Sequence, residues 1–173
     1  ADMGQIGRAQ EIIRVLMSHA ALAADPNARA AAQSAALQVQ AWSLAGRGEG
    51  QVRDPLETLR TVASDIAVPA ERANALALVA VILAKNPAVP KQASTAFLTL
   101  ASEAAKQVAN VTERSEVVGN LLAAMAGAAL ADVQDKARRG AWAQAQTAAG
   151  SLQGIVQQGS ATSVSARLMA MDY

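Results

Sequence analysis

The sequence predicts an all-α fold of about eight helices, stacked as antiparallel hairpins in an α-α superhelix, that is, a short solenoid. Hydrophobic residues make up 52% of the 173 residues but aromatic residues only 2%, so the apolar content is mostly alanine, the strongest helix former. Residues 66–84 are echoed 42 positions later by residues 108–126. A repeat near this length is typical of stacked helical hairpins.

Both copies of the repeat run from a short break, through a Glu-Arg pair, into a long apolar helix. The pairs are Glu71-Arg72 and Glu113-Arg114. A helical hairpin of this kind cannot bury its apolar face alone, and stacking against its neighbours supplies the core. The repeat therefore predicts architecture more directly than it predicts chemistry.

The first hairpin is predicted from apolar residues spaced three and four apart, which places them on one helix face. We expect one helix over residues 4–24 and a second over residues 26–44. Asp25 is suited to cap the second helix. Pro26 suits its first position, where the missing N–H is not needed.

Alternating glycines make residues 45–52 the clearest loop in the sequence. We interpret this loop as a hinge between the first hairpin and the rest of a single domain that covers residues 1–173. Asp54 and Pro55 then form a strong helix start, and the helix they open is expected to end near residue 66. Spacings of three and four predict a buried apolar stripe that contains Leu59 in this helix and another that contains Phe97 in the helix after Pro90.

The two middle hairpins carry the repeat. We predict helices over residues 71–86, 91–109 and 113–131, with Pro69 interrupting the chain before the first of them. Thr112 is expected to cap the last of the three.

The last hairpin is predicted over residues 134–158 and 160–171. Three glycines at positions 140, 150 and 154 dilute its first helix. With this pair the chain has four hairpins.

The residue composition limits the kinds of site that the chain can form. There is no cysteine, and His19 is the only histidine, so neither a zinc site nor a catalytic triad has its residues. A net charge of +1 argues against a nucleic-acid or anionic-membrane surface. The longest apolar run, residues 75–84, is shorter than the ~20 residues that span a bilayer. We predict no enzymatic activity, no cofactor, no metal, no nucleic acid and no membrane span.

The compartment is indicated only indirectly. The absence of cysteine and a start at Ala1 without methionine favour a periplasmic or secreted protein. A cytoplasmic location is the alternative.

Residues 54–131 resemble tetratricopeptide-like bacterial helical repeats. In that class the second helix of a unit often begins with Arg, followed by small and Leu positions and an Ile-Ala pair. The matching positions here are Arg72, Leu76, Val79 and Ala80 in one copy and Arg114, Val118, Leu121 and Leu122 in the other. The resemblance implies an α-α superhelix that binds proteins or peptides without catalysis.

The candidate partner-binding residues are Arg29, Arg72, Arg114 and Trp42. The functional interpretation is a row of arginines along one edge that grips carboxylates of a partner. The structural interpretation, which we favour, is that Glu sits favourably in the first turn of a helix while Arg packs its stem across the preceding hairpin. We expect Trp42 and Trp142 to fill core space and to be binding residues only if they are exposed.

Two functions remain open. The first is a protein-interaction or scaffold module that docks a peptide or protein partner in a groove of the repeat. The alternative is a compact helical bundle that acts as a structural subunit through homo-oligomer contacts, with the uncharged glutamine-rich face of residues 144–157 as one candidate contact. The basic residues Lys136, Arg138 and Arg139 are interpreted as a solvated helix face.

Overall fold

The computed structural model describes residues 3–44 and 53–162, and every regular element within these ranges is an α-helix. The predicted all-α class is therefore confirmed. The expected hinge at 45–52 lies outside the described residues. The described helices are α1 (Met3–Leu22), α2 (Pro26–Trp42), α3 (Arg53–Ser64), α4 (Pro69–Ala84), α5 (Lys91–Lys106), α6 (Val111–Arg138) and α7 (Trp142–Thr162).

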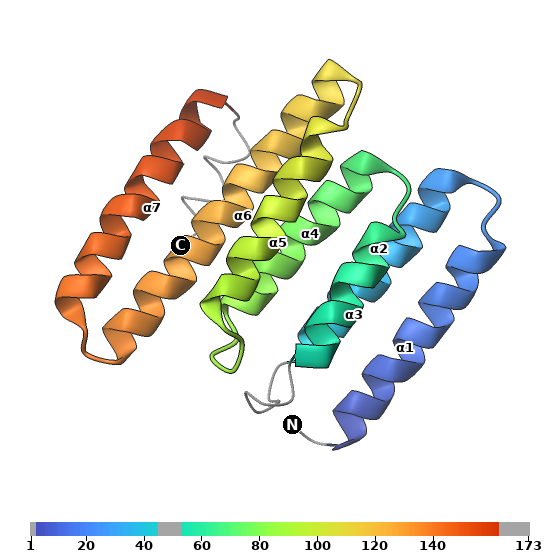
Figure 1. The fold of residues 1–173 in the computed structure, drawn as a ribbon, viewed down its shortest axis with the longest axis horizontal. Helices are drawn as coiled ribbons and strands as arrows, with labels where there is room; N and C mark the ends of the chain where they lie inside the picture. The colour runs from blue at the N-terminus through green and yellow to red at the C-terminus, as the bar shows by residue number, and fades with distance from the viewer. Residues whose placement is uncertain (1–2, 45–52, 163–173) are drawn as a thin grey trace.

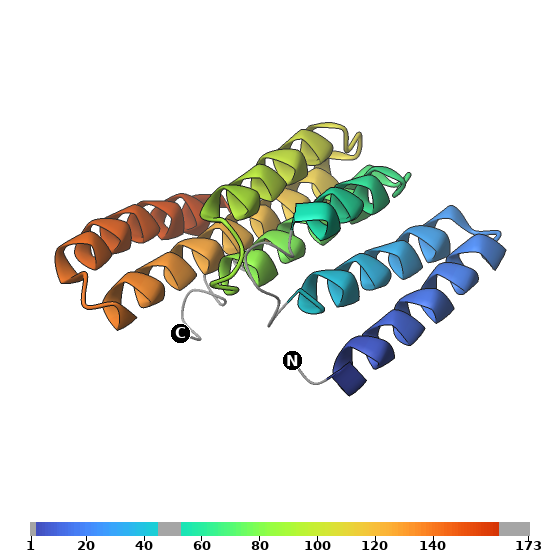
Figure 2. The same cartoon turned by 60° about the horizontal axis from the view of Figure 1, so that its bottom comes forward.

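The helices lie alongside one another, from α1 at one end to α7 at the other (Figure 1). A central row is formed by α2, α4 and α6, because α4 packs against both of the others. α1 flanks this row beside α2, and α7 flanks it beside α6. α3 and α5 lie on the same side of the row, where both contact α4 (Figure 2). α4 is thus the helix with the most neighbours.

The hydrophobic core extends from α2 to α6 and is built largely from alanine. The predicted apolar stripes of α3 and α5 face it: Leu59 and Phe97 are both 0% exposed. In α4 most of the apolar run is buried, but Val81 and Ala84 are only partly buried and Leu78 is 48% exposed. The largest fully buried side chains are Phe97, Leu37, Leu44, Leu59, Ile66, Leu83 and Val79. Alanine lets the helix backbones approach closely, so few large side chains are needed to fill the space between them.

The starts of the helices follow the predicted chemistry in part. Asp25 caps α2 as expected, accepting hydrogen bonds from the backbone N–H groups of Asn27 and Ala28, at 3.1 and 3.2 Å. Pro69 begins α4 rather than interrupting the chain before it. The prediction that Thr112 caps the next long helix is wrong. Asn110 is the cap, because its side chain accepts from the N–H of Glu113 at 3.1 Å and α6 has already begun at Val111.

The predicted break between residues 131 and 134 is also wrong, because α6 continues without interruption to Arg138. The residue that stops the helix is Gly140, which follows the C-cap Arg139 and has a φ of +73°. The N–H of Gly140 donates to the carbonyl of Ala137, and that of Ala141 donates to the carbonyl of Lys136, both at 3.0 Å. This is a Schellman C-cap, which needs the left-handed backbone that glycine adopts without strain.

A helix therefore begins at Trp142 rather than at residue 134. The count of eight helices rested on a separate helix over 160–171. Residues 160–162 belong to α7, and the remainder of that prediction lies outside the described residues. The described part of the chain has seven helices.

Two buried polar side chains join elements of the core. Asn86, 9% exposed, follows α4, and its Nδ2 donates to the carbonyl of Leu44 at 2.9 Å while its Oδ1 accepts from the N–H of Ala88. Ser94 of α5 donates to the carbonyl of Ala80 in α4 at 2.8 Å. Asn86 thereby fixes the turn between α4 and α5 to the end of α2.

Candidate functional site

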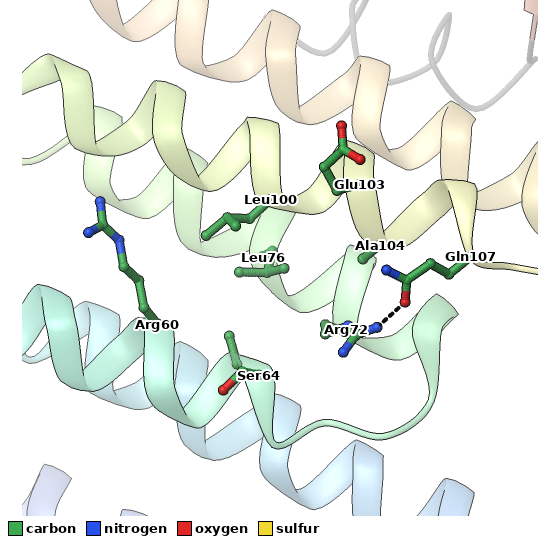
Figure 3. A pocket seen from close by; sticks show the side chains of 9 residues that line it. Arg60, Ser64, Arg72, Leu76, Leu100, Glu103, Ala104 and Gln107 are labelled. Carbon is green, nitrogen blue, oxygen red and sulfur yellow. Dashed lines mark hydrogen bonds between the residues drawn. The ribbon is translucent and has the colours of Figure 1, made fainter.

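A cleft of about 200 Å³ lies between α3 and α5, with α4 beneath it (Figure 3). It exists because α3 and α5 both contact α4 but do not close against each other above it. The residues that line it are Arg60, Ala63, Ser64, Arg72, Leu76, Leu100, Glu103, Ala104 and Gln107.

The base of the cleft is apolar. Ala63, Leu76 and Ala104, from α3, α4 and α5, are at most 3% exposed. Leu100 stands on the α5 wall and is 39% exposed. It is a large apolar side chain one helical step away from the buried Ala101, so it faces the opening rather than the core. The buried base and the partly exposed Leu100 together give the cleft an apolar surface that solvent can reach.

Charged and amide side chains surround this apolar base. Arg60 pairs with Glu57 along α3 at 2.8 Å, and Glu103 pairs with Lys106 along α5 at 2.7 Å. Both pairs are exposed and lie within a single helix, so each contributes little to stability. At one end of the cleft Arg72 donates from a guanidinium nitrogen to the side-chain oxygen of Gln107 (Figure 3).

The three candidate arginines occupy the same position in three helices. Arg29, Arg72 and Arg114 are each the fourth residue of their helix, in α2, α4 and α6, and they lie 43 and 42 positions apart. The two echoed stretches, residues 66–84 and 108–126, contain α4 and the first part of α6. The guanidinium groups of the three arginines donate to different partners.

Two of these arginines turn back onto their own chain. Arg29 donates to the carbonyl of Ala23 at 2.8 Å. Arg114 donates to the carbonyls of Val108 and Ala109, at 2.8 and 3.2 Å. Each guanidinium thereby braces the turn before its own helix. Of the three arginines, Arg72 alone lines the cleft.

The expectation that both tryptophans fill the core is wrong. Trp42 is 57% exposed at the end of α2, and Trp142 is 70% exposed at the start of α7. Neither lines the cleft between α3 and α5. Alanine packing closes the core without them, so both rings remain exposed, one on α2 and the other on α7.

The basic residues at the end of α6 belong partly to an ion-pair network. Lys91, the first residue of α5, pairs with Asp132 and, at 3.4 Å, with Asp135. Lys136 pairs with Asp132 at 2.6 Å, and Arg139 pairs with Asp135 at 2.9 Å. The network joins the start of α5 to the end of α6.

The network shifts two pKa values. The hydrogen bond to Asp132 raises the pKa of Lys91 above its ordinary value, although burial opposes it. Burial by itself would raise the pKa of Asp132, but hydrogen bonds from Lys136 and Lys91 outweigh it, and the pKa of this carboxyl is lowered. These shifts describe a structural tie between helices and not an acid–base pair in a cleft.

Within the described ranges, no group of three or more His, Asp or Glu side chains is placed to hold a metal ion. His19 is exposed near the end of α1. By length and composition alone α6 would be able to cross a membrane, a test that core helices of soluble proteins also pass.

The residues of the cleft other than Arg72 were not identified from the sequence. They come from three helices and are brought together only by packing. Leu100 carried a signal, since it is a large apolar residue beside the stripe that points to the core.

A comparison of the chain with known protein families finds no match, and comparisons with curated proteins and with solved structures find none either.

Proposed function

We propose that this chain is a non-enzymatic protein-interaction module built of stacked antiparallel helical hairpins, an α-α superhelix of the tetratricopeptide-like kind. The repeated position of the three arginines supports this arrangement, because it relates α2, α4 and α6, which pack in one row. A partner peptide or protein docks in the cleft between α3 and α5.

The observation that carries the proposal is the cleft itself. Its walls come from alternate helices, as in a groove formed by stacked hairpins, and its base is apolar. Leu76 closes the bottom while Leu100 remains partly exposed at the wall. Apolar surface at the centre with polar groups at the rim is the usual composition of a binding site.

A matched pair of variants tests the proposal. Short random peptides displayed on phage are selected on the wild-type protein, and the recovered sequences are synthesised. Leu100→Glu places a charge on the apolar wall, and we expect it to weaken binding about tenfold or more. Leu78→Glu is the control, because Leu78 is also about half exposed but lies outside the cleft.

We expect peptide binding, measured by fluorescence polarisation, to survive in the control variant. Equal losses in both variants, with both folded by circular dichroism, would contradict docking in the cleft. Failure to recover any peptide that distinguishes Leu100→Glu from wild type would remove the proposal altogether.

A second candidate function is a structural subunit that homo-oligomerises. It is favoured by α7, whose 21 residues include no charged side chain and begin with the exposed Trp142. A surface without charge can approach a second copy of itself without repulsion. Sedimentation velocity of wild type and Trp142→Ala tests this, because a monomer at all concentrations would contradict it. Solution scattering then distinguishes an extended stack from a compact bundle.

A further inference from the structure

Arg72 differs from the two other arginines of the repeat in what its guanidinium contacts. Arg29 and Arg114 donate to backbone carbonyls five or six positions before them. Arg72 instead crosses to Gln107, which follows α5 and lies on the wall of the cleft. The arginine at this helix position thus braces its own turn in α2 and α6, whereas in α4 it contributes to the cleft.

The charge of Arg72 is not neutralised within the described part of the chain. Its side-chain partner is the neutral amide of Gln107, and none of the described carboxylates forms an ion pair with it. The residue is half-buried, and its cleft neighbours Leu76 and Ala104 are apolar. A guanidinium has five N–H donors in a fork that matches a carboxylate.

The cleft has room for one large side chain beside this cation. An apolar cavity of about 150 Å³ accepts a molecule of benzene size. The cleft measures about 200 Å³, and Leu76 and Leu100 are the two largest apolar side chains that line it. An apolar side chain of a partner would therefore occupy the middle of the cleft, within reach of Arg72 at its end (Figure 3).

We infer that the partner is a peptide segment in which a large apolar side chain stands beside a carboxylate, the first entering between Leu76 and Leu100 and the second accepting hydrogen bonds from Arg72. The inference rests on the proposed function, since it specifies the chemistry of the segment that docks there. A single carboxylate fits better than a phosphate, because Glu103 places a negative charge on the α5 wall and would repel the more highly charged group more strongly.

The test is a double-mutant cycle between peptide and protein. The probes are the phage-selected peptides that bind wild type but not Leu100→Glu, each synthesised with its Asp or Glu residues and with Asn or Gln in their place. We expect one such replacement to weaken binding to wild type about tenfold or more, the loss typical of a charge-assisted hydrogen bond. In Arg72→Gln the same replacement should have little further effect.

Arg114→Gln is the matched control, because it removes the same group at the same helix position outside the cleft. It should leave the full discrimination between acid and amide peptides. Arg72→Lys keeps the positive charge but loses the forked donors of the guanidinium, so it should retain part of the preference for acid over amide peptides. It also serves as a second variant in case Arg72→Gln fails to fold.

The outcomes separate the two proposals. If the selected peptides depend on Leu100 but bind equally well as acids and as amides, the carboxylate inference is overturned while the proposed function stands. The inference is also overturned if the acid-to-amide loss is the same in Arg72→Gln as in wild type. If no peptide depends on Leu100, both are overturned.

Discussion

α4 and α7 are both alanine-rich helices, yet they lie in different surroundings. α4 packs against α2, α3, α5 and α6, and most of its residues are buried. α7 packs mainly against α6, and among its residues of described burial Ala145 alone is buried. The difference teaches that composition predicts a helix, whereas the number of its neighbours decides what each of its residues contributes to stability.

The largest expected effect is a truncation in α4. Leu83→Ala removes a side chain that is 1% exposed, and we expect it to lower the free energy of unfolding by about 2–5 kcal/mol. Leu152→Ala in α7 removes a partly exposed side chain and should cost well under half as much. Urea denaturation measures both. Equal losses would show that α7 is as deeply packed as α4.

The next effect concerns the turn that leaves α4. Asn86→Ala leaves the buried carbonyl of Leu44 without its donor, which should cost about 1–3 kcal/mol. Asn120→Ala is the control, because the exposed Asn120 bonds to Asn74 at 3.2 Å, where water can replace it. Thermal unfolding followed by circular dichroism compares the two. A loss in the control as large as in Asn86→Ala would contradict the importance of burial.

A gain is expected in α7. A Cβ added at Gly154 meets nothing within 4 Å, so Gly154→Ala should stabilise the protein by about 1 kcal/mol through helix propensity. At Gly127 of α6 the added carbon would meet Val81 of α4 at 3.5 Å, an ordinary contact, and Gly127→Ala should gain a similar amount or less. Destabilisation by Gly154→Ala in urea titrations would reveal a close neighbour on the open face of α7.

The smallest effect tests the ion pairs between α5 and α6. Asp132→Asn should lower stability at neutral pH by about 1 kcal/mol, because the network is partly exposed and solvent screens its ion pairs. The folded pKa of Asp132 lies below its ordinary value of 3.8, so its contribution is present above that pH and is lost as the pH falls through the folded pKa.

The difference between Asp132→Asn and wild type should therefore stay constant from near neutrality down to about pH 5 and shrink at more acidic pH. The raised pKa of Lys91 acts at alkaline pH, where the stability that Lys91 contributes is lost as the pH rises through its pKa in the folded protein. Urea titrations at several pH values measure the difference. A difference that grows on acidification would contradict the network.

The sequence predicted the features that depend on local periodicity. The stripes that contain Leu59 and Phe97 are buried as expected, and Asp25 caps α2. The end of α6 was mistaken because Gly140 was interpreted as a weak point within a helix. A glycine directly after a basic last turn is in fact the usual stop signal, and it was recognisable as such.

The cleft was beyond prediction from the sequence alone, because it depends on how far apart α3 and α5 stand on α4. The repeat of Arg29, Arg72 and Arg114 was visible, but the different contacts of Arg72 were not. Side chains at equivalent positions meet different neighbours wherever the adjoining turns differ. Periodicity therefore located the arginines and could not assign their roles.

The flanking positions of α1 and α7 have a consequence for how the molecule opens. A helix that packs mainly on one neighbour can detach at a lower free energy than one enclosed on several sides. Amide hydrogens of α1 and α7 should consequently exchange with solvent before those of α4. The base of the cleft lies on α4, so we expect that base to exchange slowly while the ends of the molecule fray.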